Sequence, residues 1–269
     1  MPARPQPRVL VTRSKHQTSE LATRLRELGL EPVLVPAIEL APPSSYEGLD
    51  SALAALAGFQ WVIFTSANAV EAMASRLKAS GRGVVGMFGD GESQRIAAIG
   101  PATARALEAI GIRVDLVPSQ AVAESLRDSL LANALQPDGS PTRFLLVRAE
   151  DARDVLPDAL RRAGGEVVIA PAYRTVVPAG SVETIRSLFQ QPEHLAAITF
   201  TSSSTARNLL TLCDAASVKL PDSVLRVSIG PITSETMRSL GYPPHAEALD
   251  ASVASLAEAV RQAIDERLS

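Results

Sequence analysis

The sequence predicts an α/β protein made of two similar modules, each with a doubly wound parallel β-sheet. Short apolar runs bounded by Pro, Gly or Ser alternate with amphipathic segments along the 269 residues. Near-continuous apolar strands that alternate with helices are typical of parallel sheets covered on both faces. Residues 8–36 also align without a gap with residues 143–171, and two further motifs recur at nearly the same spacing. The repeat therefore indicates two modules rather than one large domain.

Five strands are expected in each half of the chain. Helical segments with apolar residues at helical spacing, such as Leu21, Leu25 and Leu28, lie between most of them. Strands 144–149 and 166–171 could pack with the block before them or with the block after them, and the residues leave this open. The expected strands are 8–12, 32–36, 61–66, 95–100, 114–118, 144–149, 166–171, 197–202, 226–230 and 245–249.

The amino-acid composition argues against several classes of protein. The formal net charge is −3, which argues against nucleic acid as the main partner. Cys213 is the one cysteine and the three histidines are scattered, so we expect neither a disulfide nor a metal site. No apolar run approaches the roughly 18–20 residues of a membrane span. The N-terminal "MPARPQPR" lacks the apolar core of a signal peptide. We therefore expect a soluble cytoplasmic protein that does not bind membranes.

Two motifs recur where strands run into helices. "IGPAT" begins at Ile99 and "IGPIT" at Ile229, so Thr103 and Thr233 fall in first helical turns beside free backbone N–H groups. "FTS" ends two other strands, which makes Ser66 and Ser202 natural N-caps. Ligands of open α/β sheets bind at this edge, and helix N-termini favour anions. We therefore expect the two modules to turn these junctions toward one ligand with several carboxylates. Helix capping alone is the alternative.

Other polar residues allow two interpretations each. Arg13 and Arg148 occupy equivalent repeat positions just past a strand, which suits either carboxylate binding or a solvated surface charge. Tyr173 follows the second repeat block and is either a packing residue or a functional one. "GRGVVG" (81–86) has the letters of a dinucleotide fingerprint but follows a helical stretch, so we expect a loop there rather than a nucleotide site.

These motifs together resemble the uroporphyrinogen-III synthase family over nearly the whole chain. The matching stretches, in order, are "LATRLRELGLEPVLVPAIEL", "WVIFTSANAVEAM", "AAIGPATARALEAIG", "LPDALRRAGGEVVIAPAYRT", "ITFTSSS" and "SIGPITSETMRSLG". The resemblance implies two flavodoxin-like domains joined by a two-segment linker. It implies that residues 1–37 and 177–269 form one domain, that 43–170 form the other, and that 38–42 and 171–176 are the linkers.

The resemblance also implies a reaction. It implies a lyase that closes hydroxymethylbilane, a linear tetrapyrrole, to uroporphyrinogen III, with inversion of the last pyrrole ring, loss of water and no cofactor. Tyr173 matches the tyrosine that would act as general acid. The resemblance implies that substrate carboxylates are held by Arg13, Ser66, Thr103, Arg148, Ser202 and Thr233. Where many relatives have Arg-Gly-x-x-Gly-Arg this chain has "RAEDAR", so Ala149 and Ala152 replace glycines that would allow close approach of the substrate.

The leading hypothesis is thus an enzyme whose partner is a small-molecule substrate. We expect a monomer that makes transient contact with the enzyme that supplies this substrate. The alternative is a non-catalytic two-domain binder of a polycarboxylate or tetrapyrrole with a regulatory role. Retention of Tyr173, Thr103 and Thr233 favours the enzyme.

Overall fold

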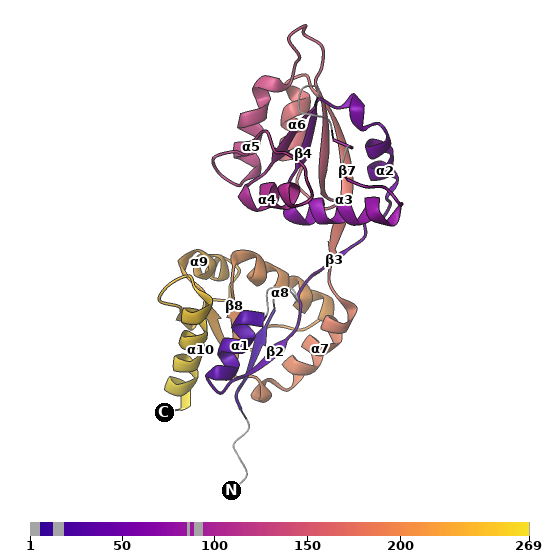
Figure 1. Ribbon diagram of the computed structural model, residues 1–269. Helices are drawn as coiled ribbons and strands as arrows, with labels where there is room; N and C mark the ends of the chain where they lie inside the picture. The colour runs from indigo at the N-terminus through magenta and orange to yellow at the C-terminus, as the bar shows by residue number, and fades with distance from the viewer. Residues whose placement is uncertain (1–5, 13–18, 85–86, 89–93, 269) are drawn as a thin grey trace. The chain divides into compact units, whose positions relative to one another are not determined.

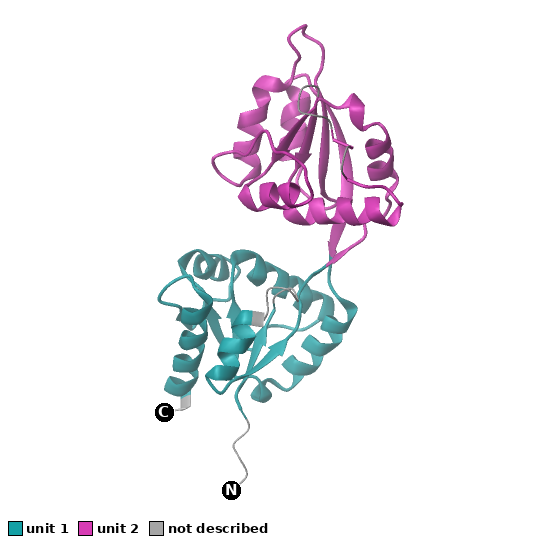
Figure 2. Cartoon of the chain, viewed as in Figure 1, with its two compact units in different colours: residues 1–39, 176–269 teal, residues 40–175 magenta. Residues whose placement is uncertain are grey.

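The computed structural model describes residues 6–12, 19–84, 87–88 and 94–268. The chain forms two compact units (Figure 2). Unit 1 contains residues 1–39 and 176–269, and unit 2 contains residues 40–175. Each unit has its own five-stranded sheet and its own hydrophobic core, and each is described here by itself.

The sheet of unit 1 has the strand order β10-β9-β8-β1-β2. Neighbouring strands are parallel, and along the unit's own strands the order is that of a doubly wound fold. The strands are β1 (Arg8–Val11), β2 (Glu31–Leu34), β8 (Ala197–Phe200), β9 (Leu225–Ser228) and β10 (Ala246–Glu247).

Helices cover both faces of this sheet (Figure 1). Side chains of a strand alternate between faces, so Val9 and Val11 pack under one helix layer and Leu10 packs under the other. The first layer contains α1 (Ser19–Glu27) and α10 (Val253–Leu268). The second layer contains α7 (Ala179–Gln190), α8 (Ser203–Ala216) and α9 (Pro231–Ser239), and a 3-10 turn, η4 (Pro192–His194), precedes β8.

The sheet of unit 2 has the order β3-β7-β6-β4-β5. Its strands are β3 (Glu39–Ala41), β4 (Trp61–Phe64), β5 (Arg95–Ala98), β6 (Arg143–Ala149) and β7 (Glu166–Val176). One face is covered by α2 (Glu47–Ala54), α3 (Ala67–Ala79) and α4 (Pro101–Ala109), and the other by α5 (Ala123–Leu130) and α6 (Val155–Arg162). Short 3-10 turns occur at η2 (Leu56–Gly58) and η3 (Leu131–Asn133).

The packing of the second repeat block, which the residues had left open, is now defined. β6 pairs in parallel with β4, with Phe144 opposite Trp61, so β6, α6 and β7 pack with the block before them. The first block of the chain, with β1 and β2, instead joins the C-terminal strands through β8. Each sheet therefore combines one repeated β-α-β block with three further strands: β1-α1-β2 joins β8, β9 and β10, and β6-α6-β7 joins β3, β4 and β5.

One expectation about strands was wrong, and both expected linkers contain strand residues although the boundaries between the two units fall within them. Residues 114–118 form no regular strand, because Leu116 makes only an isolated bridge to Ala97. Residues 39–41, expected within a linker, form β3 at the edge of the second sheet. Residues 171–176, expected to be the other linker, continue β7, because Tyr173 pairs with Ala149 and β3 lies on the other side of the strand.

Among the described residues, no helix is long and apolar enough to cross a membrane. Residues 81–84 follow α3 as turn and irregular chain, as expected, and Val85 and Gly86 of the same motif lie outside the described residues.

Candidate active site

Tyr173 and Ser66 meet at the carboxyl edge of the sheet in unit 2. Ser66 is the N-cap of α3, and its Oγ accepts a hydrogen bond from the Ala69 backbone N–H at 3.1 Å. The same Oγ lies 3.1 Å from the Tyr173 phenol oxygen, and either hydroxyl can be the donor. The phenol is therefore linked through one serine to the positive end of a helix.

A β-bulge places the Tyr173 ring there. Arg148 pairs with Pro171 and Ala149 pairs with Tyr173, so Ala172 is the extra residue of β7. Ala170 and Ala172 pack in the core under α3, and regular alternation would put Tyr173 on the opposite face. The Tyr173 ring nevertheless packs against that same core. Bulges that redirect a side chain are common next to active sites.

The loop after β6 holds the backbone of this tyrosine. The Glu150 N–H donates to the Tyr173 carbonyl oxygen at 2.8 Å. The Glu150 carboxylate accepts hydrogen bonds from the backbone N–H and the hydroxyl of Ser44, at 3.0 and 3.2 Å. Sequence reasoning missed Glu150, because nothing in the loop indicates which residue faces β7.

A cavity of about 390 Å³ opens beside Tyr173. Apolar side chains from α5 and α6, including Leu126 and Leu156, form part of its wall. Thr65, Arg148 and Arg153 add polar groups, together with the loop between β6 and α6. The cavity thus combines an apolar wall with cationic groups, as sites for organic acids do.

Arg148, expected to bind a carboxylate, is 5% exposed. Its Nη1 donates to the Arg153 carbonyl oxygen at 3.0 Å and its Nη2 donates to the Asp154 carboxylate at 2.6 Å. Its Nε is buried without a hydrogen-bond partner. The guanidinium of Arg153 is exposed and makes no ion pair with the described residues. Two of the three Arg148 nitrogens are therefore engaged within the protein.

Thr103 lies in the first turn of α4, after Pro101, and is 3% exposed. Its hydroxyl has no hydrogen-bond partner among the described residues. Gly100, the N-cap, has an extended backbone at φ −174°, which any residue can adopt. Close approach explains the glycine: a Cβ there would lie 2.5 Å from the Ala121 Cβ.

The corresponding edge of unit 1 is built from the same helix starts. Ser202 is the N-cap of α8, and its Oγ accepts from the Thr205 N–H at 3.1 Å. The Ser202 hydroxyl also contacts the hydroxyls of Ser204 and Thr205, each at 2.9 Å. Thr233 lies in the first turn of α9, is 4% exposed and has no hydroxyl partner among the described residues.

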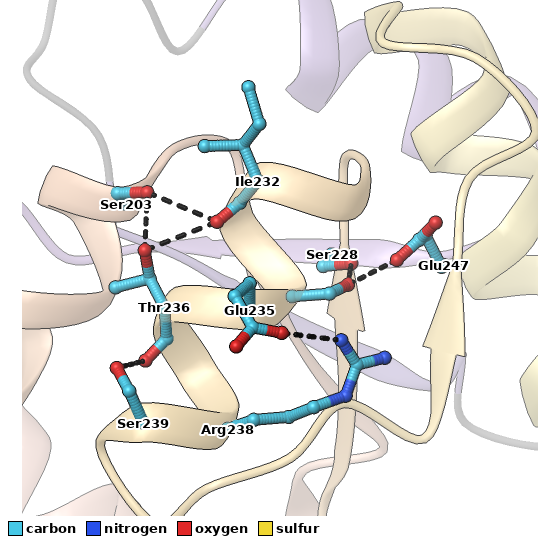
Figure 3. A network of polar contacts seen from close by, with 9 residues as sticks. Ser203, Ser228, Ile232, Glu235, Thr236, Arg238, Ser239 and Glu247 are labelled. Carbon is cyan, nitrogen blue, oxygen red and sulfur yellow. Dashed lines mark hydrogen bonds and ion pairs between the residues drawn. The ribbon is translucent and has the colours of Figure 1, made fainter.

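Hydroxyl pairs join the elements of unit 1 near these helix starts (Figure 3). Ser203 of α8 lies 2.7 Å from the Thr236 hydroxyl of α9. The hydroxyl oxygens of Ser228 and Ser234 lie 2.5 Å apart, and the Ser234 hydroxyl also donates to the Glu247 carboxylate of β10. Sequence reasoning missed this network.

A comparison of the two repeats could have found these pairs. At the positions equivalent to Ser203 and Thr236, unit 2 has Ala67 and Ala106. At the positions equivalent to Ser228 and Ser234, it has Ala98 and Ala104. Each unit 1 pair thus replaces a pair of alanines, which points to a polar requirement in unit 1 alone.

The structure thus brings Ser66 and Tyr173 together and places Arg148 at the wall of the adjoining cavity in unit 2. In unit 1 it places Ser202 and Thr233 on neighbouring helices. Arg13 lies outside the described residues. No group of His, Cys, Asp or Glu among the described residues could hold a metal ion.

The fold and these edges define a class of protein: a two-unit α/β protein with hydroxyls and helix N-termini at the carboxyl ends of parallel strands, the edge where open α/β sheets bind ligands. Comparison with known proteins gives the family. A family model described as "Uroporphyrinogen-III synthase HemD" matches residues 19–258. The chain belongs to the uroporphyrinogen-III synthase family, whose members are enzymes.

Relatives and solved structures agree. The uroporphyrinogen-III synthase of Synechococcus elongatus is 36% identical over 94% of both chains. That of Chlorobaculum parvum is 27% identical over 87% of this chain and 89% of its own. A crystal structure of a mutant uroporphyrinogen III synthase from Thermus thermophilus has a TM-score of 0.64 at 19% identity and covers 97% of this chain and 99% of its own. At that identity the structure supports the fold alone.

Proposed function

We propose that this protein is a uroporphyrinogen-III synthase, which cyclises hydroxymethylbilane to uroporphyrinogen III with inversion of the last pyrrole ring and loss of water. Membership of the family supports the reaction. The single structural observation that carries the proposal is the contact between the Tyr173 phenol and Ser66 at the start of α3. It supplies a proton donor at the edge of the sheet where ligands of this fold bind.

Tyr173 acts as the general acid. The C–O bond of the hydroxymethyl group breaks, the phenol proton joins the departing hydroxyl, and water leaves. The electron-rich pyrrole donates electrons as the C–O bond breaks, so loss of the hydroxyl needs only modest acid assistance. The phenolate that remains can accept a hydrogen bond from the Ser66 hydroxyl and can take a proton back when ring closure releases one.

Ser66 therefore supports Tyr173 rather than holding substrate alone. Its Oγ accepts the Ala69 N–H, which leaves the serine proton free to point at the Tyr173 oxygen. A hydrogen bond to a charged oxygen is roughly twice as strong as one to a neutral oxygen. The contact thus strengthens as the phenol loses its proton, which is the condition for lowering the barrier.

The carboxylates of the substrate bind at the helix starts. The first turns of α4 and α9 combine free backbone N–H groups with a threonine hydroxyl that has no partner within the described residues, at Thr103 and Thr233. Ser202 adds a third helix start, where the hydroxyl contacts Ser204 and Thr205, and we keep Arg13 as a proposed ligand. Because the threonines are almost fully buried, backbone N–H groups carry most of this binding.

Binding at several points explains how the last ring is inverted. Unassisted closure gives the non-inverted isomer, so the protein must favour a strained spiro-like transition state over the direct one. Holding several carboxylates fixes the fold of the chain of rings and converts closure into an oriented intramolecular step.

Isomer analysis tests the proposal. The purified protein is incubated with hydroxymethylbilane without added metal or nucleotide, and the oxidised products are separated by chromatography. We expect the type III isomer. A product mixture indistinguishable from the spontaneous type I product would refute the synthase and leave a non-catalytic binder.

A second measurement tests the role of Tyr173 as the general acid. Tyr173→Phe removes the phenol proton and keeps the ring, so turnover should fall at least tenfold while substrate still binds. Unchanged turnover would make Tyr173 a packing residue.

We also propose that the protein works as a monomer in the cytoplasm and receives its substrate through transient contact with the preceding enzyme. Sedimentation at micromolar concentration, with and without that enzyme, tests the monomer and the contact.

A further inference from the structure

The loop between β6 and α6 is held by side-chain contacts of its own first and last residues. Arg148 begins this stretch, is 5% exposed, and turns its guanidinium back onto the loop's far end. Its Nε is buried and has no hydrogen-bond partner.

The two hydrogen bonds of Arg148 connect the beginning of the loop to its end, so the loop is closed into a ring of contacts. Nη1 donates to the Arg153 carbonyl oxygen at 3.0 Å, and Nη2 donates to the Asp154 carboxylate at 2.6 Å. Asp154 is the N-cap residue of α6 but makes no capping hydrogen bond with its side chain. The Asp154 carboxylate accepts a hydrogen bond from Arg148 and does not cap the helix.

This ring carries the backbone contacts of Tyr173. Ala149, next to Arg148, pairs with Tyr173 across the bulge, and the Glu150 N–H donates to the Tyr173 carbonyl oxygen at 2.8 Å. The other end of the loop carries the Arg153 side chain, which lines the cavity beside Tyr173. Arg153 is exposed and has no ion-pair partner among the described residues.

We propose that Arg148 is a positioning residue, which through Asp154 and the Arg153 carbonyl fixes loop 149–154, and that Arg153 is the residue of this loop that receives a substrate carboxylate. This inference rests on the proposed function for its kinetic part. It assigns the two arginines of "RAEDAR" different tasks: the buried one holds the shape of the site, and the exposed one meets the ligand.

Three variants separate these tasks. Arg148→Gln and Asp154→Ala each break the ring, so kcat should fall about tenfold or more with KM within twofold, because Tyr173 is displaced. Arg153→Gln should raise KM about tenfold with little change in kcat, because a charge-assisted contact to substrate is lost. Arg148→Gln combined with Asp154→Ala should be no slower than Arg148→Gln alone, because both remove the same contact.

Arg226 provides a matched control. It is also a buried arginine, 7% exposed, with a nitrogen that lacks a hydrogen-bond partner, and its Nε donates to the Pro243 carbonyl oxygen at 2.9 Å. It lies in β9 near the strand's amino end, away from the carboxyl edge. Arg226→Gln should lower Tm but leave kcat unchanged, so a loss of kcat in Arg148→Gln cannot be ascribed to general destabilisation.

A readout without turnover keeps the two proposals distinguishable. Amide hydrogen exchange in peptides covering residues 149–154 and 166–176 should rise in Arg148→Gln and Asp154→Ala and stay unchanged in Arg153→Gln. If the wild-type protein lacks synthase activity, the proposed function fails while this exchange test still decides the positioning role.

The inference is overturned if Arg148→Gln raises KM with kcat unchanged, or if Asp154→Ala leaves both exchange and kcat as in the wild type. Should Arg148→Gln fail to fold, Asp154→Ala decides alone, because its target is a half-exposed side chain.

Discussion

Ser66 and Ser202 allow the role of one hydroxyl to be measured against a built-in control. Both are N-caps whose Oγ accepts a backbone N–H at 3.1 Å, at Ala69 and Thr205 respectively. Ser66 alone also contacts the phenol of Tyr173, at 3.1 Å. Replacing either serine by alanine therefore removes an N-cap hydrogen bond. Ser66→Ala also removes the contact to the proposed acid, whereas Ser202→Ala also removes contacts to the hydroxyls of Ser204 and Thr205.

The structure sets the expected magnitudes. Loss of an N-cap serine costs about 1 kcal/mol, so each variant should lose a few degrees of Tm by a similar amount. A hydrogen bond to an oxygen that becomes charged is worth about 1.5 kcal/mol or more, which corresponds to about a tenfold fall in kcat for Ser66→Ala. Ser202→Ala should mainly raise KM, because Ser202 is proposed to hold substrate.

The assay is steady-state formation of uroporphyrinogen III with thermal unfolding measured in parallel. Ser66→Thr keeps both the cap and a hydroxyl, so it should recover most of the lost kcat. Ser66→Ala should slow the enzyme no further once Tyr173 is phenylalanine. Equal effects of Ser66→Ala and Ser202→Ala on kcat, or additive effects of Ser66→Ala and Tyr173→Phe, would show that the contact does not assist proton transfer.

Two further predictions concern stability. Gly100→Ala should unfold at clearly lower urea than Gly230→Ala, because the new Cβ would lie 2.5 Å from the Ala121 Cβ, whereas the Cβ at Gly230 would have its nearest neighbour at 3.9 Å. Equal midpoints in urea would contradict this close approach. Burial, and then the charge of Arg226, lower the pKa of His245, whose Nδ1 accepts the Arg226 backbone N–H at 3.0 Å. The stability that this neutral ring contributes should be full above about pH 6.5, the unfolded value, and should be lost as the pH falls through the lowered folded value. Urea unfolding from pH 7.5 to 5 should show this loss, and His245→Asn should flatten it.

The repeated strand and helix pattern was enough to predict the α/β class, because parallel strands buried on both faces leave a strong apolar signal. Val9, Leu10 and Val11 of β1 show this directly, since all three are buried. Residues 114–118 carried the same signal, but the chain there is held to β5 by a single bridge at Leu116. Edge strands have half the pairing of central strands, and their sequence does not reveal how much of it forms.

The candidate site was predictable where it depends on local geometry. Ser66 and Ser202 were placed as N-caps from the residues alone, and both make the cap hydrogen bond. The contact between Ser66 and Tyr173 joins residues far apart in sequence and depends on the bulge at Ala172. A bulge adds one residue to one strand without any marked composition, so the direction of the Tyr173 ring could not be read from the sequence.

The internal repeat also gives a reason why the proposed mechanism has one acid rather than two. The position equivalent to Tyr173 in the first repeat block is Ile38, in "VPAIEL" against "APAYRT". Both units keep the N-cap serine and the first-turn threonine, which are the positions proposed to hold carboxylates. The substrate has many carboxylates but one hydroxyl to expel, so carboxylate binding benefits from duplication and proton donation does not. Placing a tyrosine at Ile38 should therefore leave the rate of ring closure unchanged in a Tyr173→Phe background, and recovery of activity there would show that either unit can supply the proton.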